Sequence, residues 1–307
     1  MIIMIHFKGI TKIFRTELIG QPFTALNDVT FDVPEGSMVG FLGANGAGKT
    51  TSLKIIMDFI RPTKGEVIFS PSLGSDRQEI FRNIGFLPER PYFYQNLTGE
   101  EFLQFMGGLT DLDRGTINQR VNLWAPRFKI DHALKRELKT YSKGMLQRIG
   151  FLATIIHEPK IIILDEPLSG LDPIGRKELK DVIIEVHRAG KTVFFSSHIV
   201  PDIEEICDRV IFLKNGTLAY DGSVSALMKQ SKSQDFLVTV VSPGELPLSL
   251  PVKESLFLPD ELTRFTVAPE NKDALLRHFL EKGKSIVSME MLKPSLEEIF
   301  YKTKGDV

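Results

Sequence analysis

Hydrophobic and polar residues alternate near the start of the chain and then give way to a continuous apolar run. The alternation over 28–33 predicts a half-buried strand, and the apolar run over 38–42 predicts a buried one. Glycines follow, and apolar residues then recur at helical spacing over 49–60, which predicts a helix. A strand, a glycine-rich loop and a helix in this order begin a parallel α/β unit.

The hydrophobic pattern changes near residue 96. Thr98 and Glu101 stand at the spacing of a capping box ahead of apolar residues, so we predict that a helix begins there. Up to about Thr140 the pattern indicates helices and turns, and we predict a helical subdomain over about 96–145. A strand, a helix and a strand are predicted after it, over 161–164, 173–188 and 192–195. Strands that alternate with helices favour a parallel α/β core with a helical insertion.

A polar, turn-rich segment near residue 230 predicts a domain boundary. Strands and helices are predicted beyond it, over 235–241, 264–267, 271–281, 285–291 and 295–302. We therefore predict one domain over 1–228 and a small α+β domain over 235–307, which is long enough for a modest core of its own.

Composition and charge narrow the classes of function. The chain has 307 residues, with 38 Lys and Arg against 39 Asp and Glu, so it lacks the net positive charge of a nucleic-acid binder, and no nucleic-acid partner is expected. A single cysteine, Cys207, excludes a disulfide framework and a site of several thiolates. No apolar run approaches the roughly 18 residues of a membrane span, and no basic segment precedes the first apolar residues. We therefore expect an intracellular protein without membrane spans.

The segment 43–50, GANGAGKT, matches G-x-x-x-x-G-K-[ST] between a predicted strand and a predicted helix. Backbone N–H groups of such a loop surround phosphates, Lys49 adds a positive charge, and the hydroxyl of Thr50 suits Mg²⁺. The alternative is a glycine-rich turn that carries Lys-Thr by chance, which this setting disfavours. The candidate nucleotide-binding residues here are Gly43, Asn45, Gly46, Ala47, Gly48, Lys49, Thr50 and Thr51.

Two carboxylates follow the predicted buried strand 161–164. Asp165 stands where a strand's carboxyl end can hold Mg²⁺ beside the phosphate loop. Glu166 can orient and polarise a water molecule for attack on the γ-phosphate. Two acids after a strand are more often a solvated turn, but their place after the phosphate loop and before Pro167 favours the functional interpretation.

These motifs together resemble the nucleotide-binding subunit of ATP-binding cassette (ABC) transporters. The resemblance rests on the phosphate loop, Leu164–Pro167, Ser169–Asp172, an isolated His198 after a strand, and the segment Tyr141–Arg148 at the place of the family's signature motif. It covers residues 1 to about 225. The tail, with the segment 293–300 near its end, also resembles the C-terminal extension of many bacterial ATP-binding subunits. It implies a P-loop NTPase core with an N-terminal antiparallel β subdomain and a helical insertion, followed by the small α+β domain.

The resemblance also implies how the residues act. Two copies, or this chain and a close relative, would bind two ATP molecules between them. Ser142 and Gly144 of one copy would contact the γ-phosphate held by the other, and Asp172 would bridge the two. Glu166, His198 and Lys49 would be the catalytic residues, and Phe14 matches the aromatic residue that stacks on adenine. A complete set of motifs in one chain makes a homodimer the simpler expectation.

The sequence departs from the family pattern at three positions. Lys143 and Met145 replace the commonest Gly and Gln of the signature motif, whereas the two phosphate-contacting residues are kept. In the loop 85–89, Glu89 stands where the family usually has Gln, so the expected Mg²⁺ ligands are Thr50, Glu89 and Asp165. This third acid should increase carboxylate repulsion, so we expect tight ATP binding to need the metal especially.

The resemblance predicts an ATPase at the inner face of the cell membrane that powers a separate multi-span permease, with export as the expected direction. The permease would dock on the segment from Glu89 through the helical insertion. Its socket would include Phe93, Phe102, Phe105 and Met106, unless these are core residues. The alternative is a soluble ABC-type ATPase that acts on a cytosolic macromolecule. Translation ABC proteins carry two phosphate loops in one chain, DNA-repair ATPases carry long coiled coils, and small-molecule kinases lack the signature.

Overall fold

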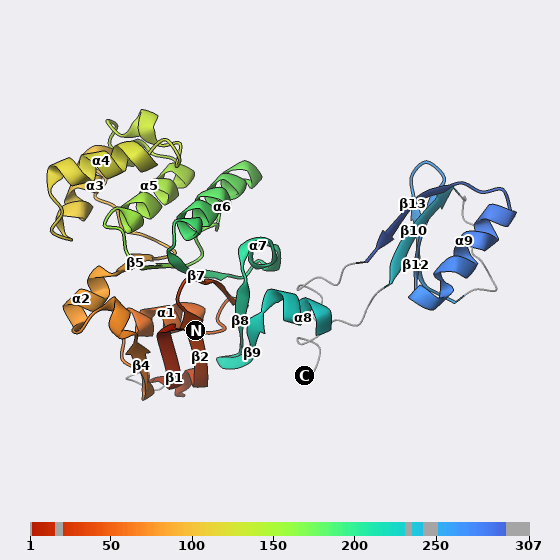
Figure 1. The fold of residues 1–307 in the computed structure, drawn as a ribbon, viewed down its shortest axis with the longest axis horizontal. Coiled ribbons are helices and arrows are strands. Elements are labelled where there is room, and N and C mark those ends of the chain that lie inside the picture. The colour runs from red at the N-terminus through yellow and green to blue at the C-terminus, as the bar shows by residue number, and fades with distance from the viewer. Residues whose placement is uncertain (1, 16–20, 231–234, 242–250, 293–307) are drawn as a thin grey trace. The chain divides into compact units, whose positions relative to one another are not determined.

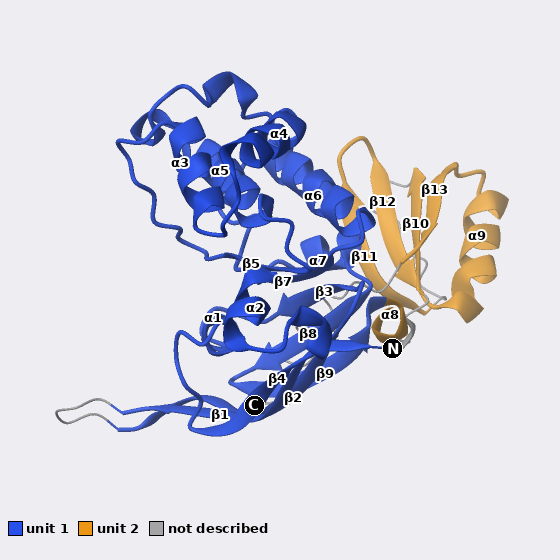
Figure 2. Cartoon of the chain, turned by 60° about the vertical axis from the view of Figure 1, so that its left-hand side comes forward, with its two compact units in different colours: residues 1–224 blue, residues 225–307 orange. Residues whose placement is uncertain are grey.

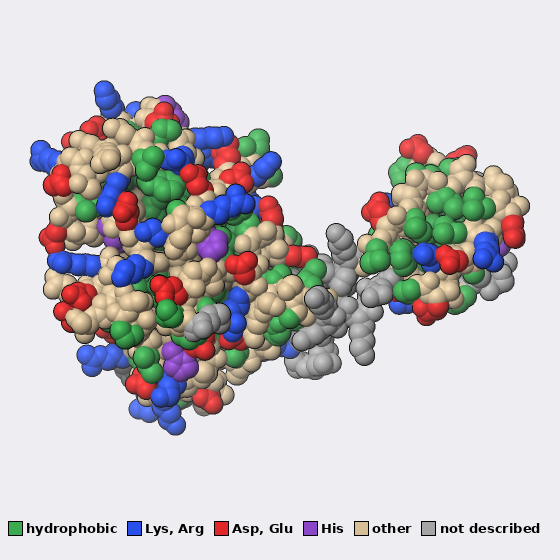
Figure 3. Space-filling view, viewed as in Figure 1, with side chains coloured by type: hydrophobic (Ala, Val, Ile, Leu, Met, Phe, Trp, Pro, Cys, Tyr) green, Lys and Arg blue, Asp and Glu red, His purple; other side chains and the backbone are tan. Residues whose placement is uncertain are grey.

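The computed structural model describes residues 2–15, 21–230, 235–241 and 251–292. The chain divides into two compact units, residues 1–224 and 225–307 (Figures 1 and 2). No helix within the described ranges is long and apolar enough to cross a bilayer. On the face of unit 1 seen in Figure 3, acidic and basic side chains are interspersed.

A three-stranded antiparallel sheet begins unit 1, in the order β2-β1-β4. Its strands are β1 (Ile3–Phe14), β2 (Phe23–Pro34) and β4 (Lys64–Phe69). The hairpin of β1 and β2 extends well beyond the rest of the unit (Figure 2), and Phe14 pairs with Phe23 near its outer end. The antiparallel β subdomain that the family resemblance implies is therefore present.

The second sheet of unit 1 has six strands in the order β5-β6-β7-β3-β8-β9, and only the β8–β9 pair is antiparallel. The strands are β3 (Met38–Leu42), β5 (Ile84–Leu87), β6 (Ile161–Leu164), β7 (Thr192–Ser197), β8 (Arg209–Lys214) and β9 (Thr217–Ser223). All residues of β3, β6 and β7 are buried, as the apolar runs predict for central strands. The helices of this part of the chain are α1 (Lys49–Ile56), α2 (Arg77–Arg82), α6 (Pro173–Arg188) and α7 (Val200–Ile206).

The helical insertion contains α3 (Gly99–Gly108), α4 (Arg114–Trp124) and the start of α5 (Lys143–Ile155). Thr98 caps α3, and its side chain and that of Glu101 form the predicted capping box. Over 96–145, all of which is described, the only strand-like pairing is the isolated bridge between Thr98 and Glu137. The prediction of helices and turns without a strand is confirmed.

Aromatic rings join the two sheets of unit 1. Phe7 of β1 stacks on Phe31 of β2 with 4.6 Å between ring centroids. Phe31 in turn lies 5.4 Å from Phe41 of β3 and 6.0 Å from Phe194 of β7. All four side chains are buried, so the strand that precedes the phosphate loop packs directly on the N-terminal sheet.

Cys207 lies at the end of α7 and is buried. A Cβ atom added to Gly40 of β3 would lie 3.0 Å from its Sγ atom, so the thiol packs closely against this strand. Burial raises the pKa of the Cys207 thiol well above its ordinary value, with the charges of Asp208 and Asp202 acting in the same direction.

Unit 2 begins at Ser225, within the helix α8 (Val224–Gln230), and contains a four-stranded antiparallel sheet in the order β11-β12-β10-β13. Its strands are β10 (Phe236–Val241), β11 (Val252–Leu258), β12 (Leu262–Val267) and β13 (Ile286–Met291). The helix α9 (Lys272–Glu281) contributes Leu275 and Phe279 to a core with Val238 and Phe265 of the sheet. The α+β class is confirmed here, whereas the predicted helix 295–302 lies outside the described residues.

The structure corrects the prediction of a loop over 85–89. Residues 84–87 form β5, which pairs in parallel with β6. Gly85 and the proline that follows the strand are turn signals in a sequence. In the structure, Gly85 instead permits close packing, since an added Cβ would lie 2.4 Å from the carbonyl oxygen of Thr154 on α5. The strands β4, β8, β9 and β11 and the helices α2, α7 and α8 were also not predicted.

Candidate functional site

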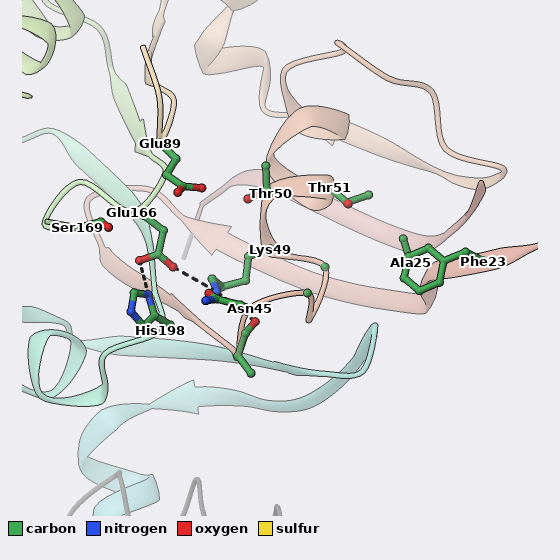
Figure 4. Close-up of a pocket in the computed structure, with 13 residues that line it drawn as sticks. Phe23, Ala25, Asn45, Lys49, Thr50, Thr51, Glu89, Glu166, Ser169 and His198 are labelled. Carbon is green, nitrogen blue, oxygen red and sulfur yellow. Dashed lines mark hydrogen bonds and ion pairs between the residues drawn. The ribbon is translucent and has the colours of Figure 1, made fainter. Parts of the chain in front are cut away.

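A pocket of about 380 Å³ lies where β3 and β6 end and α1 begins, with residues of β2 on one side (Figure 4). The residues that line it are Phe23, Ala25, Ala44, Asn45, Gly46, Gly48, Lys49, Thr50, Thr51, Glu89, Glu166, Ser169 and His198. In Figure 4, Phe23 lies at the opposite end of the pocket from Glu166 and His198. The pocket is therefore elongated, with an aromatic end and a charged end.

The phosphate loop needs glycine at its turn into α1. Gly48 adopts φ +106° and is the N-cap residue of α1, and no side chain caps this helix. A Cβ atom there would lie 2.6 Å from Leu26 Cδ2 and 2.9 Å from the Ala25 carbonyl oxygen. The loop thus packs against β2 and presents the uncapped start of α1 to the pocket, an arrangement that favours an anion.

Lys49 is a buried cation held by three groups. Its Nζ donates a hydrogen bond to the Gly43 carbonyl oxygen at 2.6 Å and a longer one to that of Ala44 at 3.4 Å. The same atom forms an ion pair with Glu166 Oε1 at 3.2 Å. Lys49 and Glu166 are 6% and 8% exposed, so little solvent screens this pair.

Asp165 lies at the end of β6, beside β7. Ser196 Oγ donates a hydrogen bond to Asp165 Oδ1 at 2.6 Å and accepts one from the Glu166 backbone N–H at 2.9 Å. Burial raises the pKa of the Asp165 carboxyl above its ordinary value, and the negative charges of Glu166 and Glu89 act in the same direction. Hydrogen bonds from Ser196 and Thr50 partly offset that rise in the pKa of Asp165. The serine therefore fixes the carboxylate of Asp165 and the backbone of Glu166.

The side chain of Glu166 is held by two neighbouring groups, and its backbone is strained. Its φ of +49° lies in the left-handed region, which a residue with a side chain rarely adopts. Its Oε2 lies 2.8 Å from His198 Nδ1, and its Oε1 forms the ion pair with Lys49 (Figure 4). A carboxylate fixed in this way at the edge of a pocket can accept a proton from a water molecule.

The signature residues and Asp172 do not line the pocket of their own chain. Ser142 is the N-cap of α5, where its Oγ accepts a hydrogen bond from the Met145 N–H at 3.2 Å, and Asp172 caps α6 in the same way through Gly175. Both caps are exposed, whereas Gly144 is half-buried beside them. These three predicted residues are therefore not brought together with the phosphate loop within one chain.

Phe14 is also outside the lining of the pocket. It is 40% exposed, and Lys12 Nζ lies 5.0 Å from the centre of its ring. Its partner across the strand pair, Phe23, lines the pocket and is 60% exposed. Sequence reasoning did not identify Phe23 or Ser196, because the position of each depends on strand register: β1 on β2 for Phe23, and β7 on β6 for Ser196.

The oxygen atoms near the charged end suit a hard divalent cation. Within the part of the chain that the structure describes, no three His, Cys, Asp or Glu side chains form a metal-binding group by themselves. Thr50 nevertheless contacts Asp165, and Glu89 acts electrostatically on the same carboxyl. One hydroxyl and two carboxylates are ligands that Mg²⁺ prefers when phosphate oxygens complete its shell.

Comparison with known proteins places this geometry in a family. A sequence model described as "ABC transporter" matches residues 26–169. An uncharacterised ABC transporter ATP-binding protein of Nostoc is 37% identical over 293 residues, which cover 94% of this chain and 86% of that protein. The bacitracin transport ATP-binding protein BcrA of Enterococcus faecalis is 33% identical over 294 residues, which cover 92% of each chain.

Solved structures share the fold. An ATP-binding subunit of an ABC transporter has a TM-score of 0.64 at 29% identity, and the match covers 74% of this chain and 92% of that chain. A dimeric ATP-binding cassette bound to ADP and Pi has a TM-score of 0.64 at 24% identity, with 72% of this chain and 99% of that chain covered.

Proposed function

This chain belongs to the ABC transporter family as an ATP-binding subunit, and from that premise we propose that two copies close around two ATP molecules to drive a separate membrane permease. The observation that carries the proposal is the fixed position of Glu166 between Lys49 and His198 beside the phosphate loop. The chain is an ATPase, and its hydrolysis of ATP powers transport.

We propose separate roles for the residues at the charged end. The N–H groups of the phosphate loop and Lys49 bind the β- and γ-phosphates, while Glu166 orients the attacking water and accepts its proton. His198, held by Glu166 Oε2, contacts the γ-phosphate. Ser142 and Gly144 of the opposite copy complete the site, and Asp172 bridges the copies. The exposed positions of Ser142 and Asp172 support this arrangement, because an exposed side chain is open to a second copy.

Mg²⁺ held by Thr50, Glu89 and Asp165 would neutralise phosphate charge at this end of the pocket. Glu89 adds a negative charge beside Asp165, and this charge should repel the phosphates of ATP when no metal is bound. A partly exposed charge contributes about 1 kcal/mol to such a repulsion. We therefore expect Glu89→Gln to bind ATP up to about fivefold more tightly than the wild type in EDTA. Binding is measured with a fluorescent ATP analogue with and without Mg²⁺. Glu100→Gln, an exposed acid on α3, is the matched control. An unchanged affinity in EDTA would remove the repulsion argument.

We propose that adenine stacks on Phe23, in the role that the family resemblance of the sequence implies for Phe14. Phe23 forms the aromatic end of the pocket, whereas one face of Phe14 is covered by Lys12. Stacking contributes about 1–3 kcal/mol, so Phe23→Ala should weaken ATP binding at least about fivefold. Phe14→Ala should change ATP affinity less than twofold. Titration with ATP distinguishes the two positions, and a larger loss for Phe14→Ala would restore the original assignment.

An exposed aromatic groove of about 530 Å³ supports docking of the permease, for which we propose export as the direction. Residues 92–97 and Phe105 line it, and Tyr92, Tyr94 and Phe105 are 85%, 51% and 41% exposed. Of the predicted socket residues, Phe93 and Phe105 line this groove. Phe102 is instead buried, with its ring 5.4 Å from that of Phe93. We propose that a cytoplasmic helix of the permease inserts its apolar side chains here.

The test is purification of the tagged full-length chain from its native cells in mild detergent, followed by mass spectrometry. A multi-span membrane protein should copurify in stoichiometric amount. The double variant Tyr94→Ser/Phe105→Ser should lose that protein and keep ATP binding, whereas Leu123→Ser, an exposed apolar residue on α4, should keep both. Copurification of only cytosolic protein or nucleic acid, together with normal ATPase activity, would favour the alternative of a soluble mechanochemical ATPase.

A further inference from the structure

The first two turns of α5 contact the segment of chain that follows Glu166. Gln147, which is buried, donates a hydrogen bond from Nε2 to the Pro167 carbonyl oxygen at 2.9 Å. Lys143 precedes Gln147 by four residues, so the two side chains lie on the same face of the helix. That face is therefore directed at the segment between Glu166 and α6.

Lys143 lies over Gly170, in the turn Ser169–Asp172. Gly170 adopts φ +71°, and a Cβ atom added to it would lie 1.9 Å from Lys143 Nζ, 2.8 Å from Cε and 3.4 Å from Cδ. The end of the lysine side chain thus occupies the space that a side chain at position 170 would need. Beside it, a Cβ atom on Gly144 would be in ordinary contact with Leu171 at 3.5 Å. The turn is packed against the start of α5 at two successive residues.

Charge pairing does not explain this position of Lys143. Its side chain is exposed and has no ion pair or hydrogen bond with any other described residue. A cation in the first turn of a helix is also opposed by the helix dipole. What the structure shows is packing: the terminal atoms of the side chain, Nζ and the last carbons of its stem, lie over the Cα atom of Gly170, and long charged side chains commonly pack in this way.

We propose that Lys143 is a positioning residue that fixes the turn Ser169–Asp172 against the start of α5. This inference rests on the proposed function, in which Ser142, Gly144 and Asp172 of one copy act on the nucleotide of the other. With Lys143 in place, these residues approach the opposite nucleotide as one rigid surface. Because these residues are already fixed in position before the two copies meet, less conformational entropy is lost when the dimer closes. Lys143 should therefore affect closure and turnover rather than the binding of ATP to a single chain.

Two substitutions separate the stem of Lys143 from its charge. Lys143→Ala removes both and should lower kcat about fivefold, within the range measured for contacting residues, while the affinity of the monomer for ATP is unchanged. Lys143→Met keeps most of the stem and should stay within twofold of the wild type. Lys177→Ala, an exposed lysine on α6, is the control. An unchanged kcat for Lys143→Ala, or an equal loss for Lys143→Met, would overturn the proposal.

The contact itself is tested by a double-mutant cycle with Gly170→Ala. The added methyl group would displace Lys143, so the single exchange should lower kcat through backbone strain and through loss of this packing. In the Lys143→Ala background only the strain remains. The fold loss of the double variant should therefore be smaller than the product of the two single losses. A loss equal to that product would show that the two residues act independently, against the proposal.

A Glu166→Gln background distinguishes this inference from the proposed function. If the Glu166→Gln chain forms no ATP-dependent dimer, the two-copy arrangement fails, and the inference fails with it. If that dimer forms and Lys143→Ala weakens it about fivefold while Lys143→Met does not, the inference is supported. A normal dimer with Lys143→Ala overturns the inference alone.

Discussion

Glu166→Gln is expected to lower ATP turnover by about 10²- to 10⁴-fold, the usual contribution of a general base. Glutamine has nearly the same shape and can keep a hydrogen bond with His198, but it cannot accept a proton from water. The phosphate loop and Lys49 are unchanged, so ATP should still bind. The variant should then accumulate as an ATP-bound dimer, because closure is retained and the step that ends it is lost.

Phosphate release and size-exclusion chromatography with and without ATP measure these two effects. Glu158→Gln is a matched control, since Glu158 also has a positive φ of +56° but is exposed and lies away from the pocket. Its turnover should equal that of the wild type. Unchanged turnover in Glu166→Gln would reject the catalytic assignment, and an inactive variant that stays monomeric with ATP would reject the role of ATP in closure.

Lys49→Met is the second exchange with a large expected effect. It keeps the aliphatic stem and removes the ammonium group, which contributes charge-assisted hydrogen bonds of about 1.5–3 kcal/mol to a phosphate. ATP affinity should therefore fall about 10- to 100-fold. In the free protein the exchange also leaves Oε1 of Glu166, a residue that is 8% exposed, without its lysine partner, so the melting temperature should fall as well.

Lys54→Met is the control, because Lys54 lies on the same helix and is exposed. Isothermal titration with ATP and a thermal melt in the absence of nucleotide give the two quantities. If Lys49→Met binds ATP as the wild type does, Lys49 does not contact the phosphates. If its melting temperature is unchanged, the ion pair with Glu166 does not stabilise the free protein.

The sequence predicts the features of this fold that depend on short segments. The phosphate loop, the buried strands β3 and β6, and the capping box of α3 are each encoded within a few consecutive residues, and all were predicted. The sequence does not predict β5, because a glycine such as Gly85 is locally a turn signal. What requires glycine there is close packing against Thr154, on a helix about seventy residues later in the chain.

The same distinction applies to the candidate site. Lys49, Asp165 and Glu166 come from contiguous motifs, and the structure places them together around one pocket, with Asp165 behind its lining. Phe23 and Ser196 depend on which residue faces which across two strands, and a single sequence does not specify that register. The contact of Lys143 with Gly170 joins two motifs that are separated in the chain, so it emerges only from the three-dimensional packing.

The buried position of Cys207 has a practical consequence. It is the only cysteine in the sequence, and burial against β3 both covers its sulfur and disfavours the reactive thiolate. A cysteine introduced on the surface of this chain would therefore react with a maleimide dye far faster than the native thiol does. Fluorophores can be attached at one chosen site without first removing a native residue, so the distance between two copies can be followed by energy transfer as ATP is added.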